Sequence, residues 1–94
     1  MTHLLIPPKY PKGDLRRMLV VLGAIDEAGE ASLVQIAVRT GLDKKTVSEL
    51  ITKAQLQAGV EISKAGAKYA IIDFGPVLKK KGAHLSLQGA LNAL

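Results

Sequence analysis

The spacing of apolar residues changes near residue 60 and separates a helix-forming part of the chain from a strand-forming part. Before that point, apolar side chains recur at intervals of three and four residues, as on one face of a helix. The first stretch follows Asp14, a residue type that caps helices, and ends before Gly29, which favours a left-handed stop. We predict a helix over residues 15–28 with the apolar positions Leu15, Met18, Leu19, Leu22 and Ile25.

Two further helices are predicted, each from a capping residue and an apolar stripe. Ser32 is the cap of the first, which ends at Gly41 after barely two turns. Asp43 is the cap of the second, which runs over residues 43–57 and stops before Gly59. The stripe of this longer helix consists of Val47, Leu50, Ile51 and Ala54.

After Gly59 the apolar period shortens towards two, which is typical of strands. Two short runs alternate apolar residues with polar or small ones, on either side of a glycine-containing stretch. We predict a hairpin over residues 61–73 with a loop of about five residues, 64–68, between its strands.

The regions that flank residues 14–74 have weaker patterns. Residues 1–13 hold three prolines and are expected to form an extended arm. Residues 75–94 are expected to form a tail in which Ser86 caps a short apolar helix. The core predicted from these patterns consists of Leu15, Met18, Leu19, Leu22, Ile25, Leu33, Ile36, Val47, Leu50, Ile51, Ile62, Tyr69 and Ile71.

Length and composition narrow the class of protein. A chain of 94 residues is expected to form one domain, because chains usually divide only beyond roughly 200 residues. Cysteine is absent, which excludes disulfides and cysteine-zinc sites and favours a cytoplasmic location. The longest apolar stretch, residues 18–25, is far shorter than the ~20 residues of a membrane span, and no signal-peptide pattern is found. We therefore expect neither membrane insertion nor export.

The net charge of +5 is unevenly distributed. Acidic and basic side chains balance over residues 1–30, so all the excess positive charge follows residue 30. A concentrated basic surface favours a polyanionic partner, with nucleic acid as the first candidate, although a solvated lysine face would give the same charge.

The segment LVQIAVRTGLDKKTVSEL, residues 33–50, resembles the helix-turn-helix of bacterial transcription regulators. Ala37 stands where the two helices of that motif cross closely. Gly41 stands where the turn requires a positive φ, and Leu42 stands where a side chain fills the turn. The inward-facing positions of the motif are matched by Ile36, Val47 and Leu50.

With the hairpin included, the resemblance covers about residues 14–74 and implies a three-helix winged helix-turn-helix. This fold is mostly helical with a small antiparallel hairpin. The implied function is sequence-specific binding of duplex DNA, as in a small bacterial or phage transcriptional regulator. Helix 43–57 would be the recognition helix in the major groove, and hairpin 61–73, the wing, would lie on the backbone.

The resemblance also implies roles for individual residues. Lysine can donate to guanine, glutamate can accept from cytosine, and hydroxyls can do either. The base-facing candidates are Lys44, Lys45, Ser48, Glu49 and Thr52; Thr46 and Lys53 lie nearer the backbone; and Arg39, Lys64 and Lys68 would contact phosphates.

Several other functions are weighed against DNA binding. His3 and His84 offer no metal-ligand spacing, and no catalytic or nucleotide-binding motif is found, so we expect no enzyme, metal, cofactor or small-molecule ligand. The main alternative is a winged-helix protein-interaction module without DNA binding, which would use the wing or the acidic residues Asp26, Glu27 and Glu30. A weakly specific DNA binder is a further alternative.

Apolar residues left outside the predicted core favour association of two chains. They lie in the arm and in the tail, and together they predict a symmetric homodimer joined through the termini. In the alternative arrangement they fold back over helix 15–28 of their own chain. The residues concerned are Leu4, Leu5, Ile6, Leu85, Leu87, Leu91 and Leu94.

Overall fold

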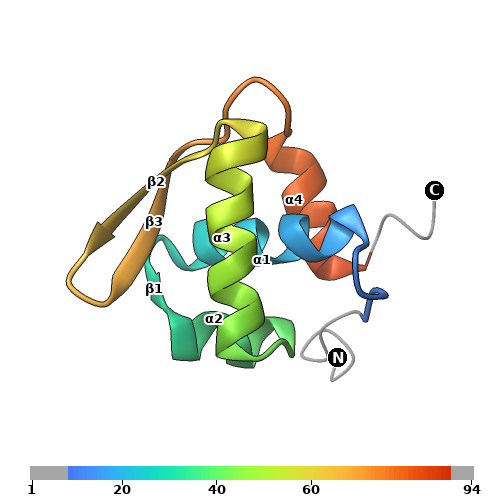
Figure 1. The fold of residues 1–94 in the computed structure, drawn as a ribbon, viewed down its shortest axis with the longest axis horizontal. Coiled ribbons are helices and arrows are strands. Elements are labelled where there is room, and N and C mark those ends of the chain that lie inside the picture. The colour runs from blue at the N-terminus through green and yellow to red at the C-terminus, as the bar shows by residue number, and fades with distance from the viewer. Residues whose placement is uncertain (1–8, 90–94) are drawn as a thin grey trace.

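The computed structural model describes residues 9–89, which form four helices and one three-stranded antiparallel sheet (Figure 1). The expected class, mostly helical with a small antiparallel hairpin, is confirmed, and a third strand adds to the hairpin. In chain order the elements are α1 (Leu15–Ala28), β1 (Ala31–Ser32), α2 (Leu33–Thr40), α3 (Lys44–Ala58), β2 (Glu61–Ala65), β3 (Lys68–Asp73) and α4 (Lys80–Gln88).

Helix α1 is the central element, and the other helices and the sheet surround it (Figure 1). Every residue from 18 to 25 is buried, as expected for a helix that is apolar on all sides. The predicted bounds are confirmed, with Asp14 accepting a hydrogen bond from the Arg16 N–H and Gly29 at the end. Leu15 is 58 % exposed, so its assignment to the core is wrong. Leu15 lies in the first turn of α1, before the buried residues 18–25 begin.

Helices α2 and α3 begin at the predicted caps. The Ser32 hydroxyl accepts from the Gln35 N–H, and the Gln35 side chain accepts from the Ser32 N–H, which completes a capping box. At the start of α3, the Asp43 carboxylate accepts from the Thr46 N–H. Both caps satisfy N–H groups that have no partner inside the helix.

The turn between α2 and α3 is tight and depends on glycine. Gly41 has φ 77° and ψ 8°, and its N–H donates to the Ala37 carbonyl at 2.8 Å. Only glycine enters this left-handed region without steric penalty. Ala37 and Leu42 are partly buried and pack against the core, at the helix crossing and in the turn as predicted.

The sheet has the strand order β1-β3-β2 and lies to one side of α3 (Figure 1). The predicted hairpin is present, but its expected loop over 64–68 is wrong. Lys64, Ala65 and Lys68 continue the strands, with Ala65 opposite Lys68, and only Gly66 and Ala67 form the turn. The short strand β1, which pairs with the start of β3, was not predicted because two residues carry no periodicity.

Helix α4 packs against α1 and completes the core on the side away from the hairpin (Figure 1). Ala83 and Leu87 are its main core residues. The prediction that Ser86 caps a tail helix is wrong, because the helix begins at Lys80 and Ser86 is fully buried within it. The predicted helical positions beyond residue 89 lie outside the described residues.

The core formed around α1 includes most of the predicted positions and several others. Met18, Leu19, Leu22, Ile25, Ile36, Val47 and Ile51 are buried, and Leu33, Leu50, Ile62, Tyr69 and Ile71 pack against them. The buried residues that were not predicted include Tyr10, Val20, Val21, Val60, Ala83 and Leu87. Most of these lie where residues before α1 and helix α4 cover the central helix, so the core extends beyond residues 14–74.

Candidate nucleic-acid interface

Helix α3 turns one face to the core and presents the other to solvent. Val47, Ile51, Ala54 and Ala58 form the buried face. At about 100° of rotation per residue, the middle of the opposite face falls near Glu49. Exposed side chains of this outward face are Lys45, Glu49, Thr52, Lys53 and Leu56.

The first turn of α3 is fixed by its cap. The Thr46 hydroxyl donates to Asp43 Oδ1 at 2.6 Å, and the Thr46 N–H donates to Oδ2 at 3.2 Å. The hydrogen bond from the Thr46 side chain is the main cause that lowers the pKa of Asp43. Because the hydroxyl hydrogen of Thr46 is used in the cap, Lys44 and Lys45 are the groups of this turn that extend into solvent.

The hairpin brings the basic side chain of Lys64 to the start of α3. Lys44 and Lys64 line the same hollow of about 270 Å³, which also includes Val34 and Tyr69. The Lys64 ammonium lies 5.4 Å from the centre of the Tyr69 ring, an attractive cation–π distance. Lys68 is exposed at the first position of β3, directly after the hairpin turn.

Not every residue of the predicted site joins this surface. Arg39 Nε donates to Glu27 Oε1 at 2.9 Å, so α2 directs this guanidinium towards the end of α1. A phosphate contact by Arg39 would have to share or replace that ion pair. The Thr52 hydroxyl donates to the Ser48 carbonyl at 3.2 Å, which leaves the Thr52 oxygen as an acceptor.

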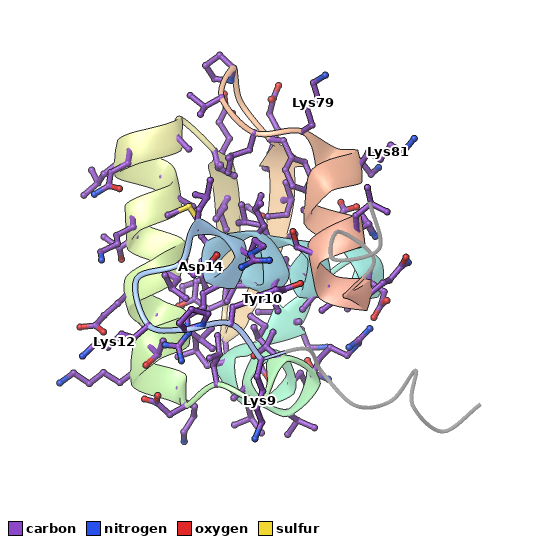
Figure 2. The ribbon with its side chains drawn as sticks, turned by 90° about the vertical axis from the view of Figure 1, so that its right-hand side faces the viewer. Lys9, Tyr10, Lys12, Asp14, Lys79 and Lys81 are labelled. Carbon is purple, nitrogen blue, oxygen red and sulfur yellow. The ribbon has the colours of Figure 1, made fainter. Side chains whose placement is uncertain are left out.

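A groove on the other side of α3 includes a residue that sequence reasoning missed. Lys12 lines this open groove of about 560 Å³, and α3 forms the opposite wall. Figure 2 shows Lys12 beside α3, at the end of the segment that leads into α1. The α3 residues in the groove are Ser48, Glu49, Thr52 and Lys53.

The sequence did contain a signal for Lys12. Lys9 and Lys12 precede the acidic residues Asp26, Glu27 and Glu30, and the charges of residues 1–30 were counted together. In the folded chain these groups separate, because Lys12 lies beside α3 whereas Asp26 contacts His84 of α4 at 2.8 Å. Residues 9–13, taken apart from α1, contain two lysines and no acidic residue, and this basic segment is visible in the sequence.

Comparison of the chain with protein-family models, with curated proteins and with solved structures finds no match. Within residues 9–89, no helix combines the length and the apolar character that crossing a membrane requires. Over the same range, no three histidine or acidic side chains gather in the way that a metal ion needs.

Proposed function

We propose that this protein binds duplex DNA sequence-specifically through a winged helix-turn-helix, as a small bacterial or phage transcriptional regulator. The observation that carries the proposal is the surface around the start of α3. There Lys44 and Lys45 of the helix and Lys64 of the hairpin are exposed together, and a tight glycine turn joins α3 to α2. In this proposal α3 enters the major groove and the hairpin lies on the neighbouring backbone.

The side chains of the outward face can supply base recognition as well as charge. Lys45 can donate to N7 and O6 of guanine, and Glu49 can accept from N4 of cytosine. Thr52 retains an acceptor for a base donor. Lys64 and Lys68 are suited to phosphates, since they extend from a hairpin that stands beside the helix.

Protein binding without DNA is the second candidate, and exposed apolar side chains favour it. Val34 and Val38, one turn apart on α2, are 55 % and 76 % exposed, and Leu56 on α3 is 80 % exposed. The acidic end of α1 supports it less, because Asp26 already contacts His84 and Lys80 and Glu27 already pairs with Arg39. Such a module would present the apolar side chains to its partner.

Electrophoretic mobility shift on a set of genomic fragments at two salt concentrations distinguishes these functions. A sequence-specific regulator retains a subset of fragments at the higher salt, whereas a weakly specific binder loses all of them together. Absence of any shift at low salt would favour the protein-interaction module.

A further inference from the structure

The segment that precedes α1 is anchored to the core. Tyr10 is 6 % exposed, and its hydroxyl donates to the Ser86 carbonyl of α4 at 2.7 Å. The Tyr10 carbonyl accepts from Arg17 Nε at 2.9 Å, and the Arg16 guanidinium lies 4.4 Å from the centre of the Tyr10 ring. Residues 9–13, which we call the arm, are therefore held in a defined position against α1 and α4.

The arm carries two lysines and no acidic residue, so it has a net positive charge. Asp14, at its junction with α1, is paired with Arg16 at 2.8 Å, and this hydrogen-bonded pair lowers the pKa of Asp14 to about 2. Lys9 and Lys12 are both exposed. Because Tyr10 is anchored to the core, the backbone positions of these two neighbouring lysines are defined as well.

The groove between the arm and α3 has the chemistry of a phosphate site. Lys12 of the arm and Lys53 of α3 both line it, together with the hydroxyl residues Ser48 and Thr52. Glu49 is the single acidic residue that lines it. Two lysines and one carboxylate leave the groove with a net positive charge.

The arm and the hairpin lie on opposite sides of α3 (Figure 1). At about 100° per residue, Lys53 lies about 40° from Glu49 in one direction and Lys44 about 140° from it in the other, so the two lysines face opposite sides of α3. Lys44 accordingly shares a hollow with the hairpin, and Lys53 shares the groove with the arm. A helix in the major groove, which is about 12 Å wide, lies between two phosphate backbones.

We propose that the arm is the second backbone contact, with one DNA strand lying in the groove so that Lys12 and Lys53 bind its phosphates. This inference rests on the proposed function and extends it, because the DNA interface then includes residues before α1. The hairpin contacts one backbone and the arm contacts the other. Glu49, between them, is directed at the bases.

The test is the salt dependence of duplex binding by the full chain and by three lysine variants, followed by fluorescence anisotropy. Lys12→Ala removes the arm contact. Lys81→Ala removes an equal charge from α4, which lies away from α3 (Figure 2), and Lys68→Ala removes a hairpin contact. All three side chains are exposed, so thermal unfolding should show unchanged stability.

Each lost phosphate contact should reduce the magnitude of the log–log salt slope by about 0.9. We expect this reduction for Lys12→Ala and Lys68→Ala, weaker binding at low salt for both, and an unchanged slope for Lys81→Ala. A reduction for Lys68→Ala but not for Lys12→Ala would overturn the arm contact and leave the proposed function standing. Equal effects of Lys12→Ala and Lys81→Ala would overturn it as well, since only net charge would then matter. Failure of the unmodified chain to bind duplex at all would overturn both.

Discussion

At Gly23 the absence of a side chain allows α1 and α4 to touch. A β-carbon at this position would lie 2.6 Å from the Ala83 carbonyl oxygen and 3.3 Å from the β-carbon of Leu87. The nearest atom belongs to the backbone of α4 at the buried residue Ala83, so it cannot move aside as a flexible side chain would. Glycine at this position therefore sets the distance between the two helices.

We predict that Gly23→Ala lowers the free energy of unfolding by about 1–2 kcal/mol, because overpacking outweighs the gain in helix propensity. Gly82→Ala, in α4, is the matched control, since a β-carbon there meets nothing within 4 Å. It should raise stability by about 0.4–1 kcal/mol. Urea denaturation measures both. Similar gains from the two substitutions would contradict the packing of α4 on α1.

Outward residues of α3 should determine which DNA sequence is bound, whereas hairpin residues should contribute affinity for any sequence. Lys45→Ala and Glu49→Ala are expected to change which fragments are preferred and to weaken the best site by about 1–3 kcal/mol. Lys68→Ala should weaken all sequences alike. Removing the Glu49 carboxylate should also strengthen nonspecific binding. Competition binding on several duplexes tests this, and equal losses on every sequence for all three variants would contradict base recognition by α3.

At the level of elements, the turn between α2 and α3 sets the direction in which α3 leaves the core. Gly41→Val introduces a β-branched side chain at φ 77° and should destabilise the protein by about 1–3 kcal/mol. Gly41→Asn is the control, because asparagine tolerates the left-handed region and should cause a smaller loss. Urea denaturation again provides the measurement. If valine is no worse than asparagine, the turn has a different conformation.

The elements that could be predicted from the sequence are those that a few neighbouring residues determine. Asp14, Ser32 and Asp43 cap helices by hydrogen bonds to N–H groups two or three residues away, so the bounds of three helices could be predicted from short segments. The start of α4 carried no such signal. Lys79, at its N-cap, makes no side-chain capping bond, and Ser86 resembled a cap although it lies on a buried face.

The candidate site was predictable on α3 and less so beyond it. The outward positions of α3 follow from helical periodicity once its buried stripe is known. Lys12 could not be placed in the same way, because its position depends on the contact between Tyr10 and Ser86, 76 residues apart in the chain. Contacts of this kind arise from the tertiary fold and leave no periodic pattern.

At the scale of the whole molecule, the burial of Leu87 in α4 weakens the case for a dimer joined through the tail. Leu87 is buried in the core of its own chain and Leu85 is half-buried, so these two need no partner. The other apolar residues that suggested association lie outside the described residues: Leu4, Leu5, Ile6, Leu91 and Leu94. The size of the molecule still favours a dimer on DNA. With a radius of gyration of 12.1 Å, two copies side by side can place their α3 helices about 34 Å apart, which is one turn of DNA.

We predict a homodimer, and sedimentation equilibrium at micromolar concentration tests it. A truncated chain must end no earlier than Gly89, because Ala83 and Leu87 belong to the core. Loss of the dimer on such truncation would place the interface in residues 90–94. A monomer for the full chain would contradict the prediction.

DNA binding by the surface around α3 is tested best by the dependence of duplex binding on salt concentration. Arg16, Arg17 and Arg39 are engaged within the chain. The exposed lysines of the proposed interface are Lys44, Lys45 and Lys53 on α3, Lys12 beside it, and Lys64 and Lys68 on the hairpin. Neutralisation of about four to six phosphates per copy predicts a log–log slope of roughly −4 to −5. A slope near zero, or no binding to duplex at low salt, would contradict DNA binding by this surface.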